Sequence, residues 1–351
     1  MDATYAGSAA KARILKSELL TEDAINRIID AANPTDIIAV LEGTSYQEHL
    51  KALSTFYSGY DLLELASTRK MISYILKVVE APPSGAMEVI KSYVSRWDIE
   101  SIKSIITSKF LGRKVDMEDL FIVDSSRFPI GLTSNLITKE DYSLMINESD
   151  VESITKYLTK LGYGVYMLRF IDEYRKERDI SILLYALDIA YFSRLVDSLK
   201  FFRGDEAPLR YYFREQVDIK NLTTIIKAKE LKLDFSSISP GLIDYGNIKI
   251  KQLTEMYSSG DHMAMREQII KYFNLEQTDE LKNMSLGDLE IEIRKSSFRK
   301  NMPKLASQSS SIGSIFYSII LAENERNNLR KIFAGKAHGM DKDRIKRMLV
   351  L

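Results

Sequence analysis

Few side chains in this sequence are suited to catalysis. It contains no cysteine and only three histidines, His49, His262 and His338, which lie far apart in the chain. The lack of cysteine excludes disulfides, thiolate zinc sites, iron–sulfur clusters and thiol nucleophiles. No two histidines stand at the spacing of metal ligands. The sequence therefore predicts neither a metal site nor a bound cofactor.

The other candidate groups have simpler explanations than catalysis. Gly335-Lys336 lacks the preceding glycine and the following Ser or Thr of a phosphate-binding loop. Pairs of acids such as Asp341 and Asp343 are common on solvated helix faces, and Ser307–Ser311 has no associated histidine that could activate a serine. We expect a protein that is not an enzyme and has no small-molecule substrate.

Charge and hydropathy exclude further classes of protein. The 351 residues include 49 Lys and Arg against 49 Asp and Glu, so the chain lacks the positive field that binds nucleic acid non-specifically. The most apolar windows, 313–322 and 180–192, are shorter than the roughly 20 apolar residues of a membrane-spanning helix. The N-terminus does not resemble a signal peptide. We expect an intracellular protein, soluble or peripherally attached to a membrane, with no nucleic-acid partner.

The elements that position these side chains are predicted to be helices. Apolar residues recur at helical spacing along most of the chain, and alternating strand patterns are scarce. Thr21, Thr138 and Ser149 are expected N-caps, and Gly162 is an expected helix end. Within residues 181–202 the apolar residues mostly follow one another in steps of three or four: Leu183, Leu184, Leu187, Tyr191, Leu195, Leu199 and Phe202. The predicted fold class is all-α.

A twelve-residue motif occurs three times. Each copy has an acid first, Ser or Asn fourth, Leu or Ile fifth, a hydrophobic pair eighth and ninth, and Lys last. The copies begin at residues 98, 218 and 325, so they are 120 and 107 residues apart. Repeats are sought first because they decide the architecture. The polar residues of the three copies are Asp98, Ser101 and Lys109; Asp218, Asn221 and Lys229; and Glu325, Asn328 and Lys336.

These separations divide the chain into three similar helical domains. With one motif at the end of each, the boundaries fall at residues 1–118, 119–238 and 239–351. A weaker similarity marks the start of each copy as a pair of helices, within 20–46, 136–163 and 250–273.

On a helical wheel at 100° per residue, the acid of the motif lies inside the apolar stripe. A buried carboxylate must be paired or hydrogen-bonded, because an unpaired one costs several kcal/mol. The simpler interpretation is that each acid anchors a neighbouring helix through an Arg, a Tyr or a backbone amide. The alternative is that the three acids contact a partner protein.

The end of the chain is basic. Residues 322–351 carry eight Lys and Arg against four Asp and Glu. Cations near the C-terminus of a helix are favourable in themselves. Alternatively, this cluster faces an acidic partner or a membrane surface.

The third copy of the motif resembles the C-terminal signature of the family of C subunits of A-type ATP synthases, the counterparts of the d subunits of vacuolar-type ATPases. Softer similarities lie at Ser311-Ile-Gly313 and at Ala186-Leu-Asp188 with Tyr191, and the first copy departs from the family by having Asp98 and Ser101 in place of Glu and Asn. The residues that match the signature are Glu325, Asn328, Leu329, Arg330, Ile332, Gly335 and Lys336.

This resemblance implies three helical domains arranged as a funnel about a pseudo-threefold axis. It also implies a non-catalytic rotor subunit of the central stalk, peripheral at the cytoplasmic face of the cell membrane. Its partners would be the proteolipid ring of the membrane sector and the central axle subunits, between which it would transmit torque. The rival hypothesis is a helical-repeat adaptor of another complex, although a unit of about 117 residues is long for a solenoid repeat.

Overall fold

The structure is a computed structural model that describes residues 3–80, 84–115, 117, 120, 136–200, 206–276, 278–308 and 311–351. These described residues form helices and no strand, which confirms the all-α prediction. Thr21 accepts a hydrogen bond from the amide of Ala24, Thr138 forms a capping box with Asp141, and Gly162 has φ +82° just after a helix. These three predicted helix boundaries are therefore confirmed. The prediction of Ser149 as an N-cap is wrong, because Asp150 caps the helix Val151–Lys160 by accepting from the amide of Ser153 at 2.8 Å.

The chain divides into two compact units. Unit 1 combines the two ends of the chain, residues 1–83 and 284–351, and unit 2 comprises residues 84–283. The first predicted domain boundary, between 118 and 119, lies outside the described residues. The second coincides with the junction between Phe235–Ile238 and a following 3-10 turn, Ser239–Gly241. The division into three domains and their pseudo-threefold arrangement remain predictions.

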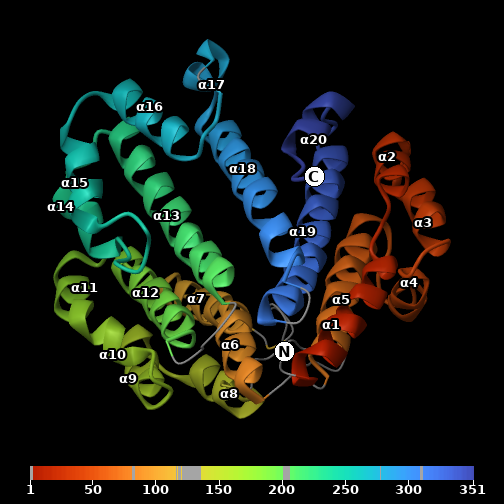
Figure 1. Ribbon diagram of the computed structural model, residues 1–351. Helices are drawn as coiled ribbons and strands as arrows, with labels where there is room; N and C mark the ends of the chain where they lie inside the picture. Colours follow the sequence, from red (N-terminus) through yellow and green to blue (C-terminus); the bar gives the residue numbers. More distant parts are fainter. Residues whose placement is uncertain are drawn as a thin grey trace. The chain divides into compact units, whose positions relative to one another are not determined.

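Unit 1 is built on two long helices, α5 and α19, which lie side by side although they come from opposite ends of the chain (Figure 1). Both helices carry fully buried apolar side chains, among them Leu63, Ile72 and Ile319, and Arg326 of α19 donates to the hydroxyl of Thr68 on α5 at 3.3 Å. Unit 1 contains α1 (Ala3–Leu15), the 3-10 turn η1 (Lys16–Glu18), α2 (Glu22–Asp30), α3 (Pro34–Glu42), α4 (Gln47–Leu53), α5 (Gly59–Val79), α18 (Leu286–Ala306), α19 (Ile312–Ala337) and α20 (Lys342–Met348).

Unit 2 is organised around α12, which packs against α6, α7 and α13. Leu183, Leu187 and Phe213 are fully buried between these helices. Unit 2 contains α6 (Ser84–Val94), α7 (Arg96–Phe110), α8 (Lys139–Asn147), α9 (Val151–Lys160), α10 (Gly164–Met167), η3 (Leu168–Phe170), α11 (Ile171–Glu177), α12 (Ser181–Asp197), α13 (Ala207–Glu230), α14 (Phe235–Ile238), η4 (Ser239–Gly241), α15 (Ile250–Ser258), α16 (His262–Tyr272) and α17 (Asp279–Asn283).

Candidate functional site

The three copies of the motif lie on α7, α13 and α19, and their acids are buried. Asp98 is 2% exposed, Asp218 is 0% exposed and Glu325 is 8% exposed. Each acid occupies the apolar side of its helix, as the helical wheel predicts. The α7 and α13 copies belong to unit 2 and the α19 copy belongs to unit 1.

Each buried carboxylate accepts a hydrogen bond from a tyrosine hydroxyl. Asp98 accepts one from Tyr142 at 2.7 Å and Asp218 accepts one from Tyr272 at 2.8 Å. In unit 1, Glu325 accepts one from Tyr46 at 2.7 Å. The three tyrosines come from different places: one lies within α8, one ends α16 and one lies in the turn after α3. The acid thus recurs at the same position of the motif, whereas the sequence separation between the acid and its tyrosine differs from copy to copy.

Asp218 accepts several hydrogen bonds in addition to that from its tyrosine. Besides Tyr272, its carboxylate accepts bonds from the amide of Ile248 at 3.0 Å and from both the amide and the side-chain amide of Asn247, at 3.2 and 2.9 Å. Gly246 approaches so closely that a Cβ atom there would lie 2.1 Å from Oδ1 of Asp218. Burial raises the pKa of Asp218, and these bonds oppose the rise because they stabilise the charged form.

Glu325 lies near a buried lysine. Burial raises the pKa of Glu325, and the nearby charge of Lys70 opposes that rise, as do the bonds from Tyr46 and from the amide of Leu20. Lys70 is 2% exposed, and burial lowers its pKa. Its ammonium lies over the ring of Tyr74, 4.7 Å from the centroid. The opposite charges of Glu325 and Lys70 stabilise each other, because either charge would be costly to bury without the other.

The fourth residue of the motif binds a backbone segment that follows its helix. Asn221 both donates to and accepts from the peptide groups of Ile243, at 2.8 and 2.9 Å. Asn328 makes the same pair of bonds with Val350, at 2.7 and 3.0 Å. In both copies the bonded residue lies 22 positions after the asparagine. Ser101 instead hydrogen-bonds to Tyr142, and the position 22 residues after it lies outside the described residues.

The final lysine of the motif donates to the carbonyl group at the end of a helix. Lys109 reaches the carbonyl of Ile146 in the last turn of α8, at 3.0 Å, and Lys229 reaches that of Tyr257 in the last turn of α15, at 2.6 Å. Lys336 reaches the carbonyl of the residue after α2. A cation at such a position stabilises the C-terminus of the helix, because the carbonyl groups of the last turn are otherwise unsatisfied. Each lysine therefore caps the first helix of a helix pair.

The motif helices also end in the same way. At the fifteenth position from the acid the backbone is left-handed, with φ +65° at Gly112, +55° at Lys232 and +66° at Gly339. The amide one residue further on bonds back to the carbonyl five residues earlier in all three copies. This pair of features is a Schellman helix end.

Taken together, these bonds tie each motif helix to a particular helix pair. Helix α7 bonds to α8 and packs against α9, α13 bonds to α15 and α16, and α19 bonds to the residue after α2 and to the turn after α3. Each motif helix thus binds the helix pair that comes next in the sequence, and the last one binds the first pair. The two ends of the chain are closed on each other in this way within unit 1.

The basic end of the chain is largely paired within unit 1. Arg330 forms an ion pair with Glu64 at 2.7 Å. Lys342 pairs with Asp30 on α2, also at 2.7 Å. Arg344 and Lys331 likewise have partners in unit 1. These four cations meet acids and carbonyl groups of the same chain.

The described residues include the groups that the sequence analysis considered for metal binding or catalysis. No group of three or more acids and histidines among them could hold a metal ion. Asp341 caps the start of α20 by accepting from the amide of Arg344. Burial, with the positive charges of Arg69 and Lys70, lowers the pKa of His49 to about 4. Within the described part of the chain, every helix is too short or too polar to cross a membrane.

The sequence predicts the acids, asparagines and lysines of the motif but misses their partners. Tyr46, Tyr142 and Tyr272 could not be singled out among 19 tyrosines, because their spacing from the acid differs in each copy. Gly246 carried a signal in principle, since a glycine beside a buried acid allows close approach of the backbone. Lys70 is hidden within an otherwise ordinary helical pattern.

Comparison with known proteins finds similar sequences over nearly the whole chain. The chain matches the profile of the family described as ATP synthase (C/AC39) subunit over residues 8–348. It is 38% identical over 353 residues to the C subunit of the A-type ATP synthase of Thermoplasma acidophilum, and 39% identical to that of Thermoplasma volcanium. Each alignment covers 100% of this chain and 99% of the relative.

A more distant relative is also similar over nearly its whole length. The C subunit of the A-type ATP synthase of Methanococcoides burtonii is 26% identical over 356 residues, which cover 99% of this chain and 94% of that protein. The resemblance found from the C-terminal motif is confirmed. The chain belongs to the ATP synthase C/AC39 subunit family.

Proposed function

We propose that this chain is a subunit of an A-type rotary ATP synthase and acts as a non-catalytic rotor part of the central stalk. Its partners are the proteolipid ring of the membrane sector and the central axle subunits. It couples the rotation of one to that of the other, and so transmits torque between ion translocation and ATP synthesis or hydrolysis. The observation that carries this proposal is the full-length similarity to relatives named as this subunit.

The contacts of the motif helices support a mechanical role. A coupling element must resist deformation, because a soft one absorbs rotation instead of passing it on. Close-packed interiors have low compressibility, and in each copy the buried acid and the half-buried final lysine of the motif bond the helix to its neighbours. These polar groups are engaged in holding helices together, which suits a structural component better than a catalyst.

A chain without a membrane-spanning helix in its described part would reach the ring by peripheral attachment, at the cytoplasmic face of the membrane. The expected interfaces each bury more than about 1,000 Å² in total, which is the lower limit for a specific contact. A high-salt wash without detergent that breaks the contacts to the ring should therefore release the chain from native membranes.

Affinity purification of the tagged chain from mildly solubilised native membranes tests this proposal. We expect the proteolipid and the axle subunits to co-purify, and cross-linking in the same sample to join the chain to both. Recovery of other partners, with neither proteolipid nor axle present, would contradict the proposal and favour a helical adaptor of another complex. The purified chain alone should hydrolyse no ATP.

A further inference from the structure

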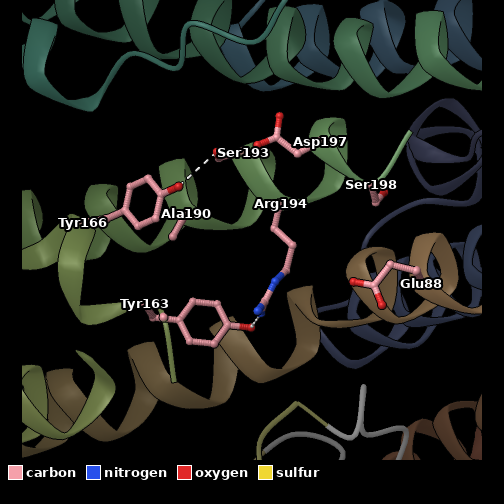
Figure 2. Close-up of a pocket in the computed structure, with 9 residues that line it drawn as sticks. Glu88, Tyr163, Tyr166, Ala190, Ser193, Arg194, Asp197 and Ser198 are labelled. Atoms are coloured by element: carbon pink, nitrogen blue, oxygen red, sulfur yellow. Dashed lines mark hydrogen bonds between the residues drawn. The ribbon is translucent and has the colours of Figure 1, made fainter. Parts of the chain in front are cut away.

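Unit 2 contains an open cavity of about 430 Å³ between α6, α10 and α12. Figure 2 shows its side chains: the guanidinium of Arg194 meets the hydroxyl of Tyr163, and Glu88 lies to one side on a neighbouring helix. Sites for small ligands have volumes of about 300 to 1,000 Å³, so the cavity is large enough for one. Its lining residues are Glu88, Gly162, Tyr163, Tyr166, Ala190, Ser193, Arg194, Asp197 and Ser198.

Arg194 is the group in this cavity with unused bonding capacity. Its guanidinium donates one bond, from Nη1 to the hydroxyl of Tyr163 at 2.9 Å, and lies 5.2 Å from the centroid of that ring. Among the described residues no carboxylate lies within ion-pair distance of it. A guanidinium has five N–H donors in a fixed planar fork. Tyr163 is 2% exposed, so it holds the guanidinium in place at the edge of the cavity.

The other polar groups of the cavity already have partners or are exposed. Tyr166 donates to Ser193 at 3.0 Å, and Ser193 donates to Tyr245 at 2.9 Å. Asp197 forms an ion pair with Lys200 at 2.7 Å, so its charge is compensated. Glu88 is exposed to solvent, which screens its repulsion of an anion in the cavity.

We propose that this cavity binds a small ligand through an oxyanion group, a phosphate or a carboxylate, held by the free N–H donors of Arg194. Arg recognises both groups through two parallel N–H···O bonds. The volume favours a small molecule, because one acidic side chain from a partner would leave most of the cavity empty. This inference is independent of the proposed function, since it concerns the isolated chain.

Calorimetric titration of the purified chain with inorganic phosphate, and separately with citrate, tests the proposal at constant ionic strength. We expect saturable binding of at least one of these probes, weakened about 10- to 100-fold by Arg194→Gln, the range for a bond to a charged group. Arg169→Gln is the matched control. Arg169 lies 5.2 Å over the ring of Tyr166 but does not line the cavity, so its removal should change the affinity less than about two-fold.

Two further variants make the result specific. Glu88→Gln removes the remaining negative charge from the cavity and should tighten phosphate binding. Arg194→Lys keeps the charge but loses the fork, so it should bind more weakly than the wild type and more tightly than Arg194→Gln. Arg194→Lys also tests the role of the guanidinium if Arg194→Gln unfolds.

Two results would overturn the inference. The first is that neither probe shows saturable binding. If Arg194→Gln then impairs only the association with stalk subunits, Arg194 belongs to a protein contact instead. The second is equal weakening by Arg169→Gln and Arg194→Gln, which would indicate an unspecific effect of charge.

Discussion

Replacing Glu325 by alanine should destabilise unit 1, because this carboxylate joins α19 to the first part of the chain. The change leaves two donors without this acceptor, the buried hydroxyl of Tyr46 and the partly buried amide of Leu20. An unsatisfied buried donor costs about 1–3 kcal/mol. Relief from burying the carboxylate, which raises its pKa, offsets part of this cost. The expected loss in the free energy of unfolding is about 2–4 kcal/mol.

Glu64→Ala is the matched control for this substitution. Glu64 pairs with Arg330 of the same helix α19, but both side chains are about half exposed, at 46% and 49%. Exposed ion pairs contribute about 0–1 kcal/mol, so this control should melt close to the wild type. Glu325→Gln should lie between the two, because the amide still accepts hydrogen bonds but no longer compensates the charge of Lys70.

Two assays separate the local effect from a general one. Thermal unfolding gives the loss of stability, and hydrogen exchange detected by mass spectrometry reports on the amide of Leu20, which should exchange faster in Glu325→Ala. A double-mutant cycle with Tyr46→Phe should give a coupling energy of about 1–2 kcal/mol, as for residues in direct contact. A loss of stability below about 0.5 kcal/mol, or no coupling with Tyr46, would refute the anchoring role.

The same contacts lead to three further predictions. Gly246→Ala should destabilise unit 2, measured by thermal unfolding, because the new Cβ would lie 2.1 Å from Oδ1 of Asp218; an unchanged melting temperature would contradict the close approach. Lys229→Met should cost about 1 kcal/mol, since the carbonyl of Tyr257 loses its donor, and a stabilised variant would argue against capping. The folded-state pKa of His49, about 4, is below the usual 6.5, so His49 contributes stability above pH 6.5 that is lost as the pH falls from 6.5 towards 4. His49→Gln should therefore flatten this part of the profile of melting temperature against pH. An unchanged profile would disprove this role of His49.

The sequence predicted the helices well because apolar spacing and capping residues are local signals. Thr21 and Thr138 cap the helices that they precede, and the acids of the motif lie on the buried side of theirs. The repeat was visible because the polar positions of the motif keep the same spacing in each copy. That spacing corresponds to the same bonds in two copies for asparagine and in all three for lysine.

What the sequence could not provide is the identity of the partners across long separations. Tyr46 and Glu325 are 279 residues apart, and no local pattern connects them. Nor could the pattern indicate that each motif helix binds the helix pair that follows it, because a repeat fixes spacing along the chain and leaves the packing between copies open. Arg194 was missed for a related reason: a single basic residue on a helix signals a cavity only when the neighbouring helices are in place.

The most direct test of the central claim is a rotation measurement on the purified ATP synthase. With the catalytic head fixed to a surface and a gold particle attached to this chain, ATP should drive rotation of the particle, in the same direction and with the same steps as a particle attached to the axle. A particle that stays still on this chain while the axle turns would contradict a rotor role.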